Sequence, residues 1–192
     1  MTDLDQLRRA LAKLYTGADE NWPAFERILH PVQFEAGAFL SQAGKTTNAI
    51  YYITAGTVRV VALYQEKETC LDFAFPGMFS TSYASFITQT PAGVSLQAIL
   101  PVNALAFYYD DLQTLYRAHP ATEKIGRLLA EQQYLRKYHR ELSLLQYTAA
   151  ERYRQLLQEH PEIVRVIPVK YVASYLGIEP ESLSRIRRNI KK

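Results

Sequence analysis

The sequence predicts an α+β fold in which a β-rich front half is followed by helices, and three observations support this prediction. Short apolar runs rich in aromatic and β-branched residues recur between turn residues from position 37 to position 99. Apolar residues then return at helical spacing from Asp110 onward. The chain closes with two short amphipathic helices joined by a tight turn, between Val169 and Ile190.

The front half begins with two expected helices and continues as strands. Leucines between Leu4 and Leu14 recur at helical spacing, and Trp22–Leu29 predicts a second short helix that ends at His30. The expected strands are Ala49–Thr54, Val58–Tyr64, Thr69–Phe75, Val94–Ile99 and Leu105–Tyr108. Short strands at nearly regular spacing, with glycine and proline between them, indicate an antiparallel sandwich or barrel.

A long helix is predicted from Pro120 to about Gln146. Residues at intervals of three and four form a heptad pattern, which we call the predicted seam: Ile125, Leu128, Gln132, Leu135, His139 and Leu142. We expect Leu129, Tyr138 and Leu145 to pack on the β-rich half instead. A helix with two such faces fits two partners, its own domain and a second copy of the chain, so the sequence predicts a homodimer. The alternative is a helix that lies on one domain only.

A further helix is expected from Ala149 to near His160. After it, the last two helices each pack through one apolar stripe. The inward positions are Val172, Ala173, Leu176, Leu183 and Ile186. Gly177 follows the first of these helices where a positive φ is tolerated, and Pro180 stands in the first turn of the second. This pattern is typical of a helix-turn-helix whose second helix presents Glu181, Ser182, Arg185, Arg188 and Asn189 outward. An ordinary helical hairpin is the alternative.

Charge is divided unevenly along the chain. From Arg165 to the end there are seven Lys and Arg residues against two acids, Glu179 and Glu181. The first 116 residues carry seven bases and eleven acids. This asymmetry is expected of a nucleic-acid-binding end. A solvated basic C-terminus is the alternative, but it does not explain why the bases alternate with apolar residues on one helix.

The segment from Phe34 to Val61, FEAGAFLSQAGKTTNAIYYITAGTVRVV, resembles the opening of the cyclic-nucleotide-binding jelly roll of the Crp/Fnr family of bacterial transcription regulators. That family follows the roll with a long dimerisation helix and a C-terminal helix-turn-helix, and the order of elements here is similar over residues 20–190. The resemblance implies a jelly-roll sensor domain at 1–116, a dimerisation helix at 117–147 and a DNA-binding domain at 148–192.

The resemblance also implies partners and contact residues. A homodimer would bind a two-fold DNA operator, with RNA polymerase as a further partner. The expected base contacts are Glu181, Ser182 and Arg185, and the expected phosphate contacts are Lys170, Arg187, Arg188, Lys191 and Lys192. The family often has an arginine where Pro180 stands, so the base triplet read here should differ.

The ligand segment of the family is altered in this sequence. Members that bind cyclic AMP use a glutamate for the ribose and an arginine with a neighbouring hydroxyl for the phosphate. A gap-free alignment from Gly77 places Ser82 at the glutamate position and Ala92 and Gly93 at the arginine pair. No Lys, Arg, Asp or Glu occurs between Phe75 and Ala98. A buried phosphate would lack a counter-charge there, so we expect no control by cyclic AMP.

The altered segment retains hydroxyl groups, and we predict a vestigial pocket formed by Ser80, Thr81, Ser82, Tyr83, Ala92 and Gly93. These hydroxyls could orient an uncharged effector of unknown identity. The alternative is that they satisfy backbone groups of turns and helix starts.

Composition narrows the classes of protein further. Cys70 is the only cysteine and the four histidines are scattered, so we expect no internal disulfide, no metal and no cofactor. No membrane segment or secretory signal is recognised, which favours a cytoplasmic protein. We expect a regulator and not an enzyme, because a cupin-type enzyme needs a histidine cluster inside the roll and His30 alone precedes His119. A sensing or signalling module whose terminal helices bind protein is the second hypothesis.

Overall fold

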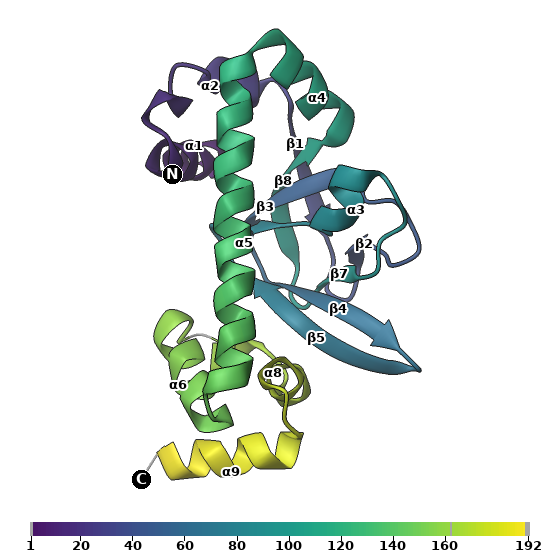
Figure 1. Cartoon of the computed structure of the whole chain (residues 1–192), viewed down its shortest axis with the longest axis vertical. Helices are drawn as coiled ribbons and strands as arrows, with labels where there is room; N and C mark the ends of the chain where they lie inside the picture. Colours follow the sequence, from purple (N-terminus) through teal and green to yellow (C-terminus); the bar gives the residue numbers. More distant parts are fainter. Residues whose placement is uncertain (1, 162, 191–192) are drawn as a thin grey trace.

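The computed structural model describes residues 2–161 and 163–190 and shows a β roll beside one long helix, with shorter helices at both ends of that helix (Figure 1). Among the described residues the strands form two antiparallel four-stranded sheets. One sheet has the order β1 (Leu29–Phe34), β8 (Val102–Tyr108), β3 (Ala49–Ala55), β6 (Phe79–Ser80). The other has the order β2 (Phe39–Ser41), β7 (Ser95–Ala98), β4 (Val58–Tyr64), β5 (Lys67–Ala74). The predicted α+β class is confirmed.

The inner faces of the two sheets enclose a core of small and branched side chains. Ala49 and Ile53 of β3 lie against Val58 of β4 and Leu96 of β7, and all four are fully buried. Gly56, in the turn between β3 and β4, has a φ of +86°. A Cβ at this position would lie 2.1 Å from the carbonyl oxygen of Pro101, so only glycine fits the turn.

Helices surround the roll and continue beyond it. Those before and within the roll are α1 (Asp3–Leu14), η1 (Thr16–Ala18), α2 (Trp22–Glu26) and α3 (Tyr83–Thr88). Those after it are α4 (Tyr109–Ala118), η2 (Pro120–Thr122), α5 (Glu123–Gln146), α6 (Ala149–Glu159), α7 (Ile163–Val166), α8 (Val169–Leu176) and α9 (Pro180–Ile190). Figure 1 shows α5 running the length of the molecule, with α1 and α2 near one end and α6, α8 and α9 at the other.

The sequence prediction was wrong at the start of the roll. The second helix ends at Glu26, and β1 begins at Leu29, where the sequence predicted that the helix would continue. Pro31 lies inside β1 and is paired with Leu105 of β8. Because β1 is the edge strand of its sheet, a proline without an N–H group is tolerated there. The proline suppressed the strand prediction, and the short elements β2 and α3 were also missed.

The faces of α5 differ from the predicted seam. Ile125 is 1% exposed and packs with Leu7 and Leu11 of α1, so it belongs to the core of its own chain. Tyr138 and Leu145 were expected to pack on the roll, but they are 45% and 77% exposed. The apolar residues on the opposite side of the helix form what we call the outer stripe: Leu128, Tyr134, Leu135, Tyr138, Leu142 and Leu145. Gln132 and His139 are exposed beside it.

Candidate functional site

The terminal helices α8 and α9 form the helix-turn-helix that the spacing predicts. Val172, Leu176 and Leu183 are fully buried between them. Gly177 has a φ of +70°, and its N–H donates to the carbonyl oxygen of Ser174 at 3.1 Å. The next N–H, of Ile178, donates to the carbonyl oxygen of Ala173 at 3.0 Å, which completes a Schellman C-cap. The angle between the two helices is therefore set by backbone hydrogen bonds as well as by apolar packing.

The outward face of α9 carries the predicted base contacts. Glu181, Arg185 and Arg188 follow one another at intervals of four and three residues, and all are exposed. Leu183 lies on the opposite side of α9 and is fully buried. Ser182 is partly exposed beside this face. In Figure 1, α9 lies across the end of the molecule that is farthest from the roll.

The predicted phosphate contacts differ in their exposure. Lys170 and Arg188 are exposed. Arg187 is turned inward, because its Nε–H donates to the hydroxyl of Tyr153 on α6 at 3.1 Å and its guanidinium lies 5.6 Å from the centre of that ring. Arg187 therefore contributes to the packing of α9 on α6. Its role as a phosphate contact stays a prediction. Lys191 and Lys192 lie outside the described residues.

The helix-turn-helix is packed directly on the roll. Phe73 and Phe75 share a buried core with residues of α6 to α9, and Phe73 lies 5.2 Å from the ring of Tyr175. The backbone N–H of Cys70 in β5 donates to the hydroxyl of Ser174 in α8 at 2.9 Å. Burial raises the pKa of the Cys70 thiol to about 12. Cys70 is thus a core residue of this contact.

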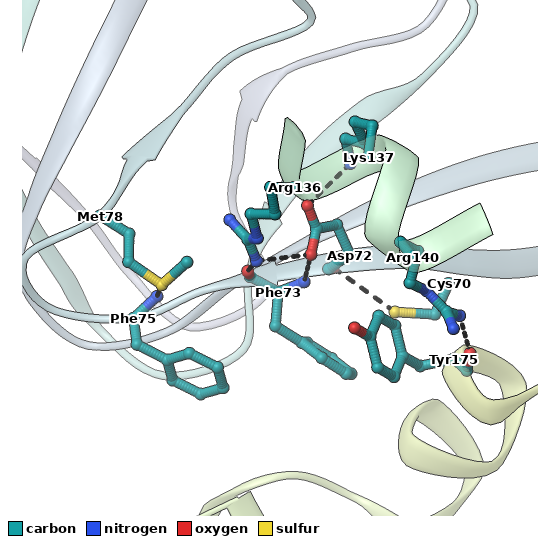
Figure 2. A network of polar contacts seen from close by, with 9 residues as sticks. All are labelled: Cys70, Asp72, Phe73, Phe75, Met78, Arg136, Lys137, Arg140 and Tyr175. Carbon is teal, nitrogen blue, oxygen red and sulfur yellow. Dashed lines mark hydrogen bonds and ion pairs between the residues drawn. The ribbon is translucent and has the colours of Figure 1, made fainter. Parts of the chain in front are cut away.

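Ion pairs also tie α5 to the roll (Figure 2). The carboxylate of Asp72 on β5 accepts from Arg136 at 2.7 Å through one oxygen and from Lys137 at 2.7 Å through the other. Arg136 also donates to the carbonyl oxygen of Phe73 at 2.8 Å. The Asp72 side chain is only 11% exposed, so its charge needs these partners. This cluster could not be predicted from the sequence, because Asp72 and Arg136 are 64 residues apart and only the fold brings them together.

A cavity of about 900 Å³, the roll cavity, lies between the roll and α5. The predicted pocket residues Ser80, Thr81, Ser82, Tyr83 and Gly93 line it. Ala92 does not line it: Ala92 is buried, its N–H donates to the carbonyl oxygen of Lys45 and its carbonyl accepts from Gly44. The hydroxyl of Thr81 donates to the carbonyl oxygen of Ala49 at 2.9 Å, so at least one of these hydroxyls satisfies the backbone, as the alternative proposed.

Cations reach the roll cavity from α5, which was not foreseen. Arg127, Arg136 and Lys137 line its wall, although the segment from Phe75 to Ala98 carries no charge. Arg136 and Lys137 are already paired with Asp72, and Arg127 is paired with Glu131. The cavity therefore has positive groups, but each has a carboxylate partner.

Two further features were sought among the described residues: a metal site and a membrane-spanning helix. Within 2–161 and 163–190, no group of three or more His, Cys, Asp or Glu side chains is arranged to hold a metal ion. No helix in the same part of the chain combines the length and apolarity needed to cross a bilayer.

Comparisons with known proteins agree with this architecture. A roll followed by a long helix and a helix-turn-helix is the fold of Crp/Fnr-type transcription regulators, and residues 31–119 match the family model of the cyclic nucleotide-binding domain. A sequence search of the curated proteins finds no match.

Three solved structures illustrate the likeness. FixK2 from Bradyrhizobium japonicum is 17% identical, with 85% of each chain covered and a TM-score of 0.71. CLP from Xanthomonas campestris, a c-di-GMP-responsive global regulator, is 16% identical over 90% of this chain and 91% of its own, with a TM-score of 0.65. The catabolite activator protein of Thermus thermophilus is 20% identical over 95% of this chain and 86% of its own, with a TM-score of 0.58. At these identities the likeness concerns the fold.

Proposed function

We propose that this chain is a DNA-binding transcription regulator of the Crp/Fnr type, acting as a homodimer on a two-fold operator. The observation that carries the proposal is the exposed polar face of α9, opposite the buried Leu183. A guanidinium such as that of Arg185 can donate to the O6 and N7 atoms of guanine in the major groove. Glu181 can accept from the amino group of cytosine, and Ser182 stands next to both.

Contacts with the phosphate backbone of DNA would position α9 in the groove without distinguishing one base sequence from another. Lys170 and Arg188 are exposed on α8 and α9 and are suited to phosphate oxygens. We assign Lys191 and Lys192, beyond the described residues, to the same role. Such contacts make binding depend on salt concentration.

The homodimer is proposed to form through the outer stripe of α5. Leu135 and Leu145 are 52% and 77% exposed, and an apolar row along 24 helical residues is suited to pairing with a second copy. Gln132 and His139 would lie at the edge of that interface. Pairing of two α5 helices would present two α9 helices to successive major grooves of one DNA face.

The remaining parts of the proposal follow from this function. Residues 1–116 would form the sensor domain, 117–147 the dimerisation helix and 148–192 the DNA-binding domain. The protein would work by binding and not as an enzyme. It would act in the bacterial cytoplasm, where DNA and its further partner RNA polymerase are found.

Cyclic AMP is not expected to be the effector. The family positions for its ribose and phosphate are held by Ser82, Ala92 and Gly93. The nearby cations Arg136 and Lys137 are paired with Asp72, and a nucleotide phosphate would have to displace that carboxylate. Calorimetric titration of the full chain with cyclic AMP should give no saturable heat. Stoichiometric binding at micromolar concentration would contradict this expectation.

Selection of DNA from a random pool by the full-length protein tests the function. We expect enrichment of a sequence with two inverted half-sites, about 10 base pairs from centre to centre. Binding should weaken steeply as salt is raised. Failure to enrich any sequence, with equal binding to the starting and selected pools, would contradict the proposal. That result would favour terminal helices that bind protein.

A further inference from the structure

A second cavity, of about 610 Å³, lies where the roll, α5, α6 and the end of α8 meet; we call it the junction cavity. Its walls include Asp72 and Phe73 of β5, Arg140 of α5, Arg152 of α6 and Tyr175 of α8. Cavities of this volume accommodate small molecules. Arg140 and Arg152 do not line the roll cavity, so the two spaces have different chemistry even though they share the wall at Asp72.

Two arginines of the cavity wall, Arg140 and Arg152, contribute positive charge to the junction cavity. Arg140 donates to the carbonyl oxygen of Tyr175 and lies over its ring, with 3.8 Å between the guanidinium carbon and the ring centre. Arg152 donates to the carbonyl oxygen of Leu176 at 2.7 Å and to that of Tyr147. Both cations therefore meet the carbonyl end of α8, where positive charge is favourable.

These contacts with carbonyl oxygens do not satisfy every N–H group of the two guanidinium groups. The Nε–H groups of Arg140 and Arg152 are buried, and neither finds a hydrogen-bond acceptor within residues 2–161 and 163–190. In that same portion of the chain neither arginine makes an ion pair with a carboxylate. Burial, and then the charge of Arg140, lower the pKa of Arg152. A buried donor without an acceptor is costly, and so are two like charges close together.

The carboxylates of the cavity wall do not offset this charge. Both carboxylate oxygens of Asp72 are already paired, one with Arg136 and the other with Lys137, and these two cations also line the cavity. The other lining carboxylate, Glu159, is exposed. The cavity therefore offers two cations that have no carboxylate partner among the described residues, beside the aromatic side chains of Phe73 and Tyr175.

We propose that the junction cavity binds a small phosphorylated molecule, with its phosphate group held between Arg140 and Arg152. A doubly charged oxyanion offsets both cations at once, which a single carboxylate does less well. The aromatic wall would hold the organic part of the ligand. This site is separate from the α9 surface, and the proposal does not depend on DNA binding.

Titration of the full-length protein with pyrophosphate and with inorganic phosphate, followed by calorimetry, tests the site. The wild-type protein should bind pyrophosphate saturably with one site per chain. Arg152→Gln should weaken binding about tenfold or more, because a charge-assisted pair is lost. Arg154→Gln is the matched control: Arg154 lies on the same helix, is exposed and does not line the cavity, so its loss should leave the affinity unchanged.

A second variant covers the case in which loss of Arg152 disturbs folding. Gln155 lines the cavity and is exposed, so Gln155→Glu places a negative charge there with almost no change in shape. It should also weaken pyrophosphate binding while leaving the circular dichroism spectrum unchanged. No saturable heat with the wild-type protein, or equal affinities for the wild type, Gln155→Glu and Arg154→Gln, would overturn the proposal. Equal affinities would mean that pyrophosphate binds elsewhere on the surface.

Discussion

Over residues 134–145 the two faces of α5 reverse the usual arrangement of a helix in a protein, whereas Ile125, near the start of α5, packs in the core of its own chain. The face toward its own chain carries Arg136, Lys137 and Arg140, and these charged groups are held by Asp72 and by a carbonyl of α8. On the outer stripe, Leu128 and Leu142 are partly exposed, and the other four residues, Tyr134, Leu135, Tyr138 and Leu145, are exposed in the single chain. Charged groups face inward where there are partners for them, and apolar groups face outward where the chain itself offers none.

This contrast assigns a different task to each face. A buried carboxylate with two cations fixes the position of α5 on β5, and such a pair is costly to break on one side. A row of exposed apolar side chains is unfavourable in water and becomes favourable when a second copy covers it. The inner face therefore determines how the helix sits on its own roll, and the outer face determines how two chains associate.

The largest expected effect comes from breaking the outer face. Leu135→Arg places one cation from each chain at the middle of the proposed interface, where they would repel each other without counter-charges. We expect the dimer to dissociate. Sedimentation velocity should show a change from twice the chain mass of 22.0 kDa to that mass. An unchanged dimer would place the interface on another surface.

The inner face is tested by Asp72→Asn, which removes the charge and keeps the shape. Arg136 and Lys137 would lose their carboxylate, and we expect the free energy of unfolding to fall by about 2 kcal/mol. Glu131→Gln is the control, because Glu131 pairs with Arg127 in an exposed i,i+4 arrangement, for which about 0.5 kcal/mol or less is expected. Urea unfolding measures both, and equal losses would contradict the distinct role of Asp72.

A smaller loss of stability is expected from a change at the start of α6, the helix that follows α5. Thr148 caps α6: its hydroxyl accepts from the N–H of Glu151, and the Glu151 carboxylate accepts from the N–H of Thr148 at 2.8 Å. Thr148→Ala should lower the free energy of unfolding by about 1 kcal/mol. A loss indistinguishable from zero in urea unfolding would mean that packing alone fixes the start of α6.

The same cap gives the smallest expected effect, a dependence on pH. Hydrogen bonds from the Thr148 side chain and backbone lower the pKa of Glu151 below its ordinary value of 4.5. A lowered pKa contributes stability that is present above that ordinary value and is lost as the pH falls through the folded pKa. The stability difference between the wild type and Glu151→Gln should therefore shrink as the pH falls below about 4.5. A constant difference over this range would contradict the role of the carboxylate.

The elements that the sequence predicted well are those whose signal is local. The helix-turn-helix depends on Gly177, Pro180 and apolar spacing within about twenty residues, and each has the expected place. The outer stripe was predicted only in part. Leu128, Leu135 and Leu142 were recognised, but Tyr138 and Leu145 were expected on the side of the helix that packs on the roll. Assigning a side chain of α5 to one face or the other requires knowing which face packs on the roll. The spacing of apolar residues alone does not determine this.

The parts that could not be predicted depend on contacts between distant segments. Asp72 meets Arg136 only because β5 lies beside α5, and Arg187 turns inward only because Tyr153 of α6 lies next to it. Residue type suggested that Arg187 was free for phosphate, but the fold supplies a partner that the sequence does not reveal.

The most direct test of the central claim is the affinity of the wild-type protein and of Arg185→Ala for the selected DNA, measured by fluorescence anisotropy. Arg185 is exposed on the outward face of α9 and its side chain makes no hydrogen bond, ion pair or ring contact within the described residues, so its loss should act mainly on DNA recognition. We expect binding to weaken by about 1–3 kcal/mol and base preference to relax at one position of each half-site. Unchanged affinity and unchanged preference would contradict the assignment of α9 as the recognition helix.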